Sequence, residues 1–368
     1  MRLAVDLRPA LSGATGVGLY MERLLAAMAG RPDAPELHLF SASLKERFDP
    51  LRLPEALRGR LADRRLPVRL LNLAWHRLRF PPIDWLLGRR VDLSHSPTPM
   101  ILPCRGRTVV TVHDLFFLAR PELVRGEMRR HYPRLLAASL RRADGVICVS
   151  RATRDALVER FPGIAGRAVA IHSGVGSEFL EPAHPSGPLP AGLPPRYLLF
   201  VGTIEPRKNL PLLLQALLDL RRAGLAIPLV VAGGRGWGLG EYLRLKNKLG
   251  GQVFELGYVP ATHLPGLYRG AAALALPSLD EGFGFPVLEA LACGVPVLCS
   301  AIPALQEVGG DRASYFDPRR CGDLRDRLAA LWRGETRFDA VAARAHAARF
   351  TWQATAGETI AFYRRLLP

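Results

Sequence analysis

Short apolar runs recur along the chain, and stretches with the periodicity of a helix separate most of them. Strands of a parallel sheet are covered by helices on both faces, so they appear as continuous apolar runs rather than as alternating ones. The pattern therefore predicts α/β architecture in both halves of the chain, with helices at residues 20–28, 152–160 and 210–222 among others. The expected strands are residues 3–7, 109–113, 146–150, 168–172, 197–201, 229–232, 253–256, 273–276 and 295–299.

A proline-rich segment separates the two series of strands. Residues 181–195 contain six prolines among 15 positions, a composition that stiffens a chain and is typical of linkers. We therefore expect two doubly wound, Rossmann-like domains, residues 1–185 and 186–348, facing a central cleft. Ligands of such sheets bind beyond the carboxyl ends of the strands, so the chemistry is expected there.

The length of 368 residues is enough for about two domains with buried cores, which excludes a disordered chain. No apolar stretch approaches the roughly 18 to 20 residues that cross a bilayer, and no signal-peptide pattern follows Met1. The five cysteines lack the spacing of a zinc site and are expected to be reduced thiols. These features favour a cytoplasmic protein.

The chain is strongly basic, with a formal net charge of +17. Residues 45–90 carry 12 cations against five acids, and residues 120–142 are also rich in arginine. Such a surface suits anionic lipid, a phosphate-bearing substrate or nucleic acid, and an ordinary solvated face is the alternative. A nucleic-acid-binding protein is the main non-enzymatic alternative, although the chain has neither an RNA-binding aromatic signature nor zinc spacing.

A glycine-rich turn follows the first expected strand. Gly13, Gly16 and Gly18, within residues 12–25, allow a tight turn into a helix whose N–H groups could hold a phosphate. The segment lacks the Lys-Ser/Thr pair of a P-loop, and no acidic strand end clearly supports a dinucleotide fold. A purely structural turn is the alternative.

Two further candidates follow expected strands. His113 and Asp114 lie at a strand end, where an imidazole could hydrogen-bond a sugar hydroxyl or move a proton; a structural histidine is the alternative. After a later strand, Gly202 permits close approach, while Arg207 and Lys208 precede a helix N-terminus that already favours an anion. Lys208 is one of only four lysines in an arginine-dominated chain, which indicates that an ammonium group is needed there.

The most specific pattern is PSLDEGFGFPVLEALACGVPV, at residues 277–297. Glu281 and Glu289 are eight positions apart, the first in a glycine-rich loop and the second early in an apolar helix. Backbone N–H groups from Gly282 to Phe285 would point at an anion, and Glu289 could accept hydrogen bonds from a vicinal diol such as ribose. An exposed acid pair is the alternative, but a glutamate among apolar helix residues is uncommon without a function.

Together these motifs resemble those of the retaining glycosyltransferases of family 4, which have the GT-B fold. The resemblance covers nearly the whole chain and is strongest in EPRKN at residues 205–209 and in the E-x7-E pattern of Glu281 and Glu289. The glycine loop, the pair at residues 113–114 and CVSRATRDAL at residues 148–157 add to it. The family includes bacterial mannosyltransferases and lipopolysaccharide or exopolysaccharide sugar transferases. It implies an N-terminal acceptor-binding domain, a C-terminal donor-binding domain, and a terminal helix within residues 349–368 that crosses back to complete the first domain.

The resemblance also implies roles for individual residues. Arg207 and Lys208 would neutralise the donor diphosphate, and Glu281 would lie near the hexose. Glu289 would bind the ribose, and His113 would reach the donor sugar, so that His113, Arg207, Lys208 and Glu281 would act in catalysis. The other donor-binding residues that it implies are Gly16, Gly18, Gly202, Thr203, Tyr258, Val259, Gly282, Phe283, Gly284 and Phe285, with Tyr258 and Val259 against the base.

Two departures from the family pattern leave the donor open. Thr203 stands where many relatives have an arginine, and residues 172–175 replace the commoner asparagine before a glycine. GDP-mannose is the favoured donor by analogy with mannosyltransferases, while UDP-glucose, UDP-N-acetylglucosamine and deoxysugar donors remain open.

The implied activity is the retaining transfer of a hexosyl group to an acceptor hydroxyl in cell-surface polysaccharide synthesis. No Asp-x-Asp sequence occurs, and we expect no metal or other cofactor because the two cations would take the metal's place. The basic first half suits a lipid-linked or glycan acceptor and peripheral binding to the inner face of the cytoplasmic membrane. A sucrose- or trehalose-type synthase, a nucleotide-sugar epimerase of the same fold and a non-catalytic scaffold are the alternatives.

Overall fold

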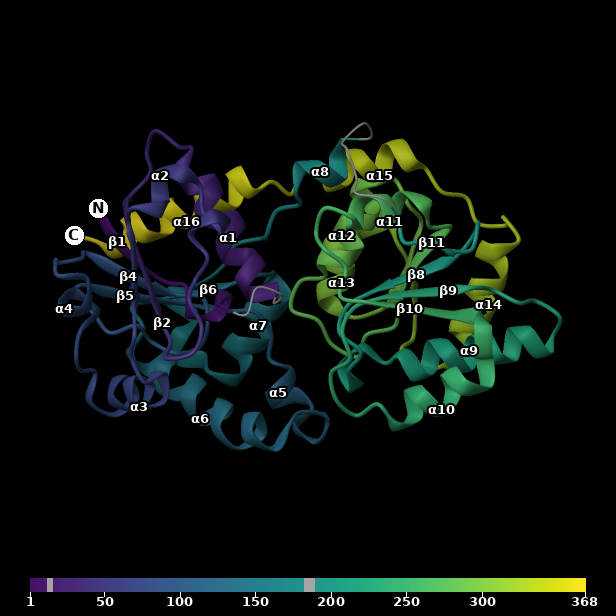
Figure 1. The fold of residues 1–368 in the computed structure, drawn as a ribbon, viewed down its shortest axis with the longest axis horizontal. Helices are drawn as coiled ribbons and strands as arrows, with labels where there is room; N and C mark the ends of the chain where they lie inside the picture. Colours follow the sequence, from purple (N-terminus) through teal and green to yellow (C-terminus); the bar gives the residue numbers. More distant parts are fainter. Residues whose placement is uncertain (12–15, 182–188) are drawn as a thin grey trace. The chain divides into compact units, whose positions relative to one another are not determined.

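Two separate parallel sheets organise the chain in the computed structural model, which describes residues 1–11, 16–181 and 189–368 (Figure 1). One unit comprises Met1–Ala119, Gly126–Gly174 and Thr351–Pro368. The other comprises Arg120–Arg125 and Val175–Phe350. Both units have the doubly wound α/β architecture that the apolar runs predict, and the fold prediction is confirmed.

The first unit contains a seven-stranded sheet in which all neighbouring strands are parallel. The strands are β1 (Arg2–Asp6), β2 (Glu36–Ala42), β3 (Leu61–Arg64), β4 (Leu93–Ser96), β5 (Arg107–Val112), β6 (Gly145–Cys148) and β7 (Ala168–Ala170). Their order is β3-β2-β1-β4-β5-β6-β7, so the direction of winding reverses between β1 and β4. A crevice forms at such a reversal, beyond the carboxyl ends of the two strands.

The second unit contains a six-stranded parallel sheet. The strands are β8 (Leu198–Val201), β9 (Leu229–Ala232), β10 (Val253–Gly257), β11 (Ala273–Leu276), β12 (Val297–Ser300) and β13 (Ser314–Phe316). Their order is β10-β9-β8-β11-β12-β13, and here the reversal lies between β8 and β11. The second sheet therefore has its own crevice at the ends of those two strands.

Helices connect the strands in both units. The first unit has α1 (Gly16–Ala29), α2 (Glu55–Arg58), α3 (Val68–Leu78), α4 (Ile83–Leu87), α5 (Phe116–Ala119), α6 (Gly126–Arg142), α7 (Arg151–Arg160) and α16 (Trp352–Leu366). The second has α8 (Ser177–Leu180), α9 (Leu210–Arg222), α10 (Gly240–Leu249), α11 (Leu264–Gly270), α12 (Phe285–Ala292), α13 (Pro303–Gly309), α14 (Cys321–Trp332) and α15 (Ala340–Ala347). Helix α9 matches its predicted bounds, because its leucines are buried while Arg221 and Arg222 in its last turn are exposed.

All nine predicted strands are present, and β2, β3, β4 and β13 were not predicted. Strand β4 reads LSHS, a polar sequence, yet Ser94, His95 and Ser96 are fully buried. Ser94 Oγ donates to the Leu102 carbonyl at 2.5 Å, and His95 Nε2 lies 2.7 Å from Thr111 Oγ1. Hydrogen bonds to distant residues satisfy these groups, and the apolar pattern gives no sign of them.

The chain divides after Gly174 and after Phe350. The linker composition predicted the first division at 185/186, and the resemblance implied the second at 348/349. The backbone N–H of Val175 donates to the Phe350 carbonyl at 2.9 Å. The Arg269 guanidinium donates to the carbonyls of Glu178 and Glu181 at 2.7 and 2.6 Å. These bonds hold the residues before the prolines on the second unit. Residues 182–188 of the expected linker, and Gly13 of the glycine turn, lie outside the described residues.

A short segment within the first half of the sequence also belongs to the second unit. Residues Arg120–Arg125 group with it, because Trp237 Nε1 donates to the Leu123 carbonyl at 3.1 Å. The Arg125 guanidinium lies 5.2 Å from the centre of the Trp237 ring. No local pattern predicts this exchange, since both contacts join residues more than a hundred positions apart.

The terminal helix α16 returns to the first unit and lies beside α1 (Figure 1). Thr351 Oγ1 caps it by accepting a hydrogen bond from Ala354 N at 3.1 Å. The Tyr363 hydroxyl lies 2.6 Å from His95 Nδ1, inside the core of this unit. The returning helix that the resemblance implied is confirmed.

His95 makes the first unit sensitive to acid. Burial, with a smaller contribution from His113, lowers the pKa of His95 to about 3, so the ring is neutral in the folded protein. Its pKa in the unfolded chain is near 6.5. The neutral ring therefore makes its full contribution to the stability of the folded state above about pH 6.5. As the pH falls below that value the free energy of unfolding decreases, by roughly 2 kcal/mol near pH 5.

We expect His95→Gln to remove this part of the acid sensitivity, because an amide can bridge Tyr363 and Thr111 without taking up a proton. Urea unfolding near pH 7 and near pH 5 measures the difference in unfolding free energy. The matched control is His131→Gln at an exposed position, which should keep the full loss seen in the wild type. An equal loss in His95→Gln would contradict the prediction.

Candidate functional site

Two loops meet at the crevice of the second unit. One follows β8 and passes through Gly202 into the short 3-10 helix Pro206–Lys208. The other follows β11 and runs through Ser278 to Gly284, where α12 begins. The N–H of Leu279 donates to the Arg207 carbonyl at 2.8 Å, so the two loops are joined. Side chains from two distant sequence motifs therefore converge at the reversal of the sheet.

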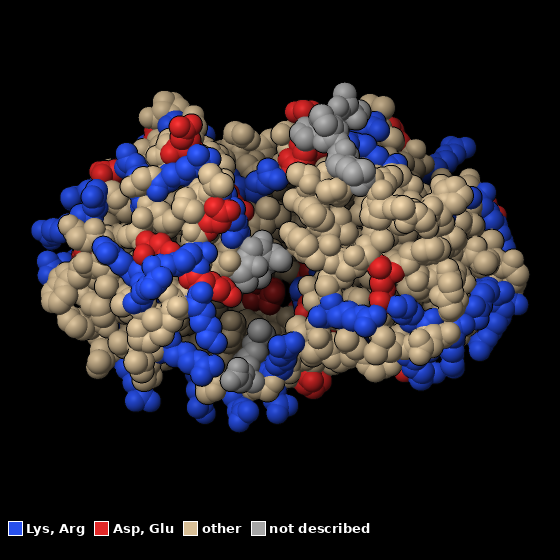
Figure 2. Space-filling view, in the orientation of Figure 1, with Lys and Arg blue, Asp and Glu red and all other residues tan. Residues whose placement is uncertain are grey.

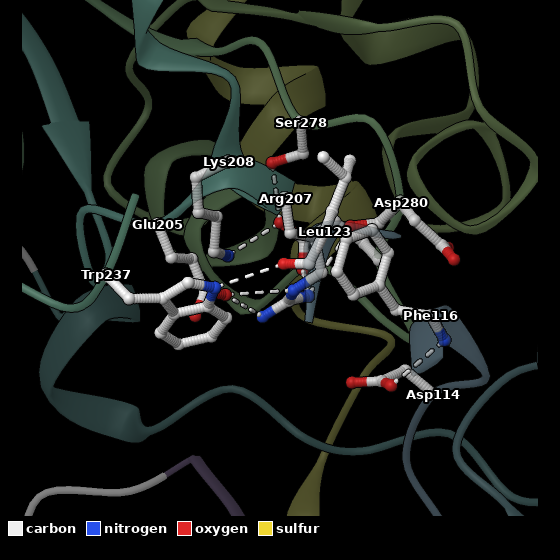
Figure 3. Close-up of polar contacts among 10 residues, drawn as sticks. Asp114, Phe116, Leu123, Glu205, Arg207, Lys208, Trp237, Ser278 and Asp280 are labelled. Atoms are coloured by element: carbon white, nitrogen blue, oxygen red, sulfur yellow. Dashed lines mark hydrogen bonds and ion pairs between the residues drawn. The ribbon is translucent and has the colours of Figure 1, made fainter. Parts of the chain in front are cut away.

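Glu281 pairs with both cations of the first motif. Its Oε2 accepts from Arg207 Nη1 at 2.8 Å, and its Oε1 accepts from Lys208 Nζ at 2.6 Å. Ser278 Oγ donates to the same Oε1 at 2.7 Å, and Glu205 Oε1 accepts from Arg207 Nε at 3.0 Å. Figure 3 shows Lys208, Arg207, Ser278 and Glu205 pointing toward one another. The sequence singled out Arg207, Lys208 and Glu281 but did not predict this pairing, nor the parts of Ser278 and Glu205.

Most of this ionic cluster is buried. Lys208 and Glu281 are only 7% and 9% exposed. Burial by itself raises the pKa of Glu281, but the charges of Lys208 and Arg207 and the hydrogen bonds from Lys208 and Ser278 outweigh it and lower the pKa to about 2. The carboxylate is therefore ionised at neutral pH. With Glu205 it balances the two cations, and the cluster as a whole carries no net charge.

The backbone at Gly202 accommodates the lysine. Gly202 has a φ of 143°, and a Cβ there would lie 3.3 Å from Lys208 Cε. A Cβ on Gly233, at the end of the adjacent strand β9, would lie 2.0 Å from the Gly202 carbonyl oxygen. Two glycines thus allow close packing at this turn. Gly202 leaves room for the Lys208 side chain, and Gly233 lets the end of β9 approach the Gly202 carbonyl.

Glu289 lies in α12 and is almost fully buried. The Tyr268 hydroxyl, from α11, donates to its Oε2 at 2.7 Å. Burial and the negative charge of Glu289 raise the pKa of Tyr268, so the phenol stays protonated and fixes the orientation of the carboxylate. The sequence did not single out Tyr268, since its only local signal is a tyrosine in a short helix.

The loop between the two glutamates is part of the core. Gly282, Phe283 and Gly284 are buried, and Phe285 is half-buried. The ring of Phe283 meets that of Phe285 edge-on at 5.2 Å, and that of Phe350 at 6.2 Å. The Phe283 side chain therefore packs against two other aromatic rings.

The remaining candidates of this unit are more open. Thr203 is exposed beside the glycine turn. Tyr258 is 64% exposed and Val259 is half-buried, and both follow β10, the edge strand two places from β8. They share the carboxyl edge of the sheet with the cluster, and no recorded hydrogen bond joins them to it within the described residues. A cavity of about 530 Å³ near Arg312 and Arg337 lies by the amino ends of β12 and β13, and none of the candidates lines it.

His113 belongs to the first unit and follows β5. Its Nε2 lies 3.0 Å from the Pro97 carbonyl, which can only accept, so this nitrogen carries the proton. Its ring meets Tyr20 edge-on at 4.9 Å. Burial lowers the pKa of His113 to about 4 against the opposing effect of Asp114, so the ring is neutral at physiological pH. This histidine is a fixed donor and not a group that titrates near neutral pH.

The other candidates of the first unit have local roles in the structure. Asp114 accepts a hydrogen bond from Phe116 N at 3.2 Å, at the start of α5 (Figure 3). Gly16 and Gly18 form the first turn of α1, the former exposed and the latter buried. A Cβ on Gly16 would meet none of the described atoms within 4 Å. Across the described ranges, no group of three or more His, Cys, Asp or Glu side chains is placed to hold a metal ion.

The pairing of Glu281 with both cations predicts that it competes with an incoming anion. In Glu281→Gln the amide no longer neutralises Arg207 and Lys208, so we expect inorganic pyrophosphate to bind at least ~10-fold tighter, about 1.4 kcal/mol. Isothermal titration calorimetry in EDTA measures the affinity, and a melting curve checks that the variant is folded. The control is Glu241→Gln, which breaks an exposed ion pair to Arg244 and should change nothing. Equal or weaker binding to Glu281→Gln would show that the carboxylate does not compete.

Comparison with known proteins places these features in one family. Residues 188–345 match the model described as glycosyl transferases group 1, and residues 14–179 match that described as glycosyltransferase family 4. The chain is 31% identical over 385 residues to the O-antigen chain mannosyltransferase B of Escherichia coli, and the match covers 100% of both proteins.

Solved structures agree in fold. A sucrose-phosphate synthase from Thermosynechococcus elongatus superposes with a TM-score of 0.75 at 20% identity, covering 100% of this chain and 99% of that one. Anabaena HepE in complex with UDP and glucose gives 0.70 at 18% identity, covering 99% and 100%. At these identities the likeness shows the fold alone. With the two family models and a relative matched over its whole length, the chain belongs to the family 4 glycosyltransferases and has their GT-B fold.

Proposed function

We propose that the protein transfers a mannosyl group from GDP-mannose to a hydroxyl of a lipid-linked or glycan acceptor in cell-surface polysaccharide synthesis. The transfer retains the anomeric configuration and needs no metal ion. The observation that carries the proposal is the cluster of Arg207, Lys208 and Glu281 at the crevice between β8 and β11. The mannosyl group and the GDP donor rest on the similarity to the O-antigen mannosyltransferase, which is an analogy.

Arg207 and Lys208 stabilise the leaving diphosphate. Negative charge develops on its oxygen as the glycosidic bond breaks, and preorganised cations in a buried site act strongly on such charge. Arg207 also donates to Glu205, and this bond does not depend on Glu281, so it can keep the guanidinium in place when the diphosphate binds. The start of α9 follows directly at Leu210 and adds the positive end of its dipole.

Donor binding then exchanges one anion for another. In the unliganded cluster the carboxylate of Glu281 neutralises the cations. When the diphosphate takes that place, Glu281 is released from one or both ion pairs and its oxygens become acceptors for hydroxyls of the transferred sugar. A single glutamate thus balances the charge before binding and orients the sugar afterwards.

The nucleoside is held at the same edge of the sheet. Glu289, fixed by the Tyr268 hydroxyl, accepts hydrogen bonds from the ribose diol. The exposed ring of Tyr258, with Val259 beside it, offers a surface for the base. The contacts with the ribose and with the base favour a nucleotide as ligand. They do not distinguish one base from another, which depends on the residues around the base.

Retention is explained by attack from the face of the leaving group. The departing phosphate oxygen takes the proton of the acceptor hydroxyl, and no carboxylate of this chain is required to form a covalent intermediate. His113 is neutral and its Nε2 proton is bound to the Pro97 carbonyl, so it positions the donor sugar rather than carrying a proton.

Transfer from radiolabelled GDP-mannose to a mannose-containing oligosaccharide tests the proposal. We expect Lys208→Ala and Glu289→Ala each to lower kcat/KM at least ~100-fold, because each removes a contact made to the donor. Lys248→Ala, an exposed lysine on α10, is the control and should retain wild-type rates. Excess EDTA should leave transfer undiminished. Wild-type rates in both site variants would reject the site, and a strict Mg²⁺ requirement would reject the metal-free mechanism.

The acceptor proposal includes binding to an anionic membrane surface through the first unit. Figure 2 shows Lys and Arg side chains along the lower part of this unit, where Figure 1 places α3 and α6. Large apolar side chains are exposed on α3 and just after it, namely Leu70, Leu73, Leu78 and Phe80, and Trp85 is exposed on α4. An interfacial surface combines these two features. No helix in the part of the chain that the structure describes is long and apolar enough to cross a membrane.

Flotation with vesicles tests this surface. At low salt the protein should float with vesicles containing anionic lipid, and it should be released at high salt because the attraction is screened. The double variant Leu70→Glu/Leu73→Glu should float several-fold less, since it adds negative charge and removes apolar contact. Leu51→Glu, at a residue that is also exposed but lies outside α3, is the control. No preference for anionic over neutral vesicles would argue against peripheral binding.

A further inference from the structure

A cavity of about 270 Å³ lies at the crevice of the first sheet, the counterpart of the crevice that holds the ionic cluster in the second unit. Asp6, the last residue of β1, and Thr98, just beyond β4, line it. Helices α3 and α6 complete it with Asn72 and Tyr132. The topology of the sheet therefore makes this the ligand-binding position of the unit.

The polar side of the cavity is a fixed network centred on Arg8. Its Nε and Nη2 donate to the two carboxylate oxygens of Asp6 at 2.8 and 2.7 Å, and its Nη1 donates to Asn72 Oδ1 at 2.6 Å. The guanidinium also lies 4.5 Å from the centre of the Trp75 ring. Both members of the ion pair are almost completely buried. Neither side chain can turn away without breaking several contacts.

This network sets what the cavity can offer to a ligand. Because Asn72 Oδ1 accepts from Arg8, its Nδ2 is directed elsewhere, and within the described residues no protein group accepts from it. Asp6 Oδ1 already accepts from both the backbone N and Nε of Arg8, so Oδ2, which accepts only from Nη2, is the carboxylate oxygen with capacity for a further donor. The cavity thus presents one amide donor and one carboxylate acceptor at fixed positions, which suits a pair of hydroxyl groups.

The other side of the cavity is apolar. Met100 and the partly exposed ring of Tyr132 line it. The Tyr132 ring is held edge-on against Phe117 at 5.6 Å. An apolar wall opposite a few fixed polar groups is the usual composition of a small-molecule site. The hydroxyls and the C–H face of a pyranose ring match these two sides.

The charge of the lining excludes an anionic ligand. Arg8 is the cation of the cavity, and Asp6 neutralises it through a bidentate pair with good geometry. A phosphate would have to displace a buried carboxylate and also approach it, so the cavity favours an uncharged group. In the second unit, by contrast, Glu281 is shared by two cations, so an anion can take one of them while the carboxylate keeps the other.

We infer that this cavity is the subsite for the uncharged terminal sugar ring of the acceptor glycan, with Asn72 and Asp6 binding its hydroxyls and Tyr132 packing on its apolar face. The inference rests on the proposed glycosyl transfer and adds the residues that select its acceptor. The loop that lines the cavity begins next to Pro97, whose carbonyl accepts from His113. The subsite and the histidine assigned to the donor sugar are therefore held by the same loop.

Binding of methyl α-D-mannopyranoside, an uncharged single ring, tests the subsite without turnover. Saturation-transfer NMR on the full-length protein should show saturable binding to the wild type. Asn72→Leu, which keeps the size but removes the amide donor, and Tyr132→Ala should each weaken it at least ~10-fold. His131→Ala on α6, next to Tyr132 in sequence, does not line the cavity and should bind as the wild type does. Mannose 6-phosphate should bind no more tightly than the neutral ring, and tighter binding would overturn the inference.

Kinetics and GDP binding separate a failure of this inference from a failure of the proposed function. In Asn72→Leu and Tyr132→Ala, the KM for a soluble oligosaccharide acceptor should rise at least ~10-fold while the thermal shift caused by GDP stays unchanged. If the wild type transfers sugar and binds GDP but both lining variants match the control, the subsite alone is overturned. If the wild type neither transfers sugar nor responds to GDP, the proposed function fails, and the acceptor role of the cavity fails with it.

Discussion

Each sheet in this protein reverses its direction of winding at one place, and that constraint decides where polar side chains can meet. Parallel strands are joined by right-handed crossovers, so β1 and β4, like β8 and β11, lie side by side while their following segments leave toward opposite faces. The backbone cannot fill the space between those segments. Residues just beyond the strand ends line it, whatever their chemistry. One topological rule therefore produces two crevices, one in each unit.

The two crevices differ in how their charges are compensated. In the second unit Arg207 and Lys208 share Glu281, which lies at the point where an anion would enter. Under the proposed function, an anion that binds there replaces Glu281, and the binding free energy is a difference between two strong interactions. In the first unit Arg8 pairs with Asp6 and lies over the ring of Trp75. Its charge therefore holds these side chains together instead of attracting a ligand. Under this proposal, arginine binds the ligand in the second unit and supports the structure in the first.

Buried polar groups also hold the first unit together. His95 joins Thr111 on the next strand to Tyr363 on the terminal helix, a residue 268 positions away. All three lie in the core, where an unpaired polar group costs more than a hydrogen bond gains. The histidine remains neutral because burial disfavours its charged form. The last helix of the chain is consequently part of the first unit's core, and its removal would expose β4.

By itself the sequence determined nine strands and singled out the motifs around Arg207 and Lys208 and around Glu281 and Glu289, because continuous apolar runs, glycine turns and a helix-start cation pair are local signals. The sequence did not predict strands β2, β3, β4 and β13, since their residues are stabilised by neighbours that are distant in the chain. Only the tertiary structure decided that Glu281 pairs with Arg207 and Lys208, that Tyr268 holds Glu289, and that residues 120–125 belong to the second unit. It also placed Asp6, Asn72 and Tyr132 around one cavity. Each of these depends on the register of strands and the packing of helices that are distant in sequence, and no local pattern encodes such distances.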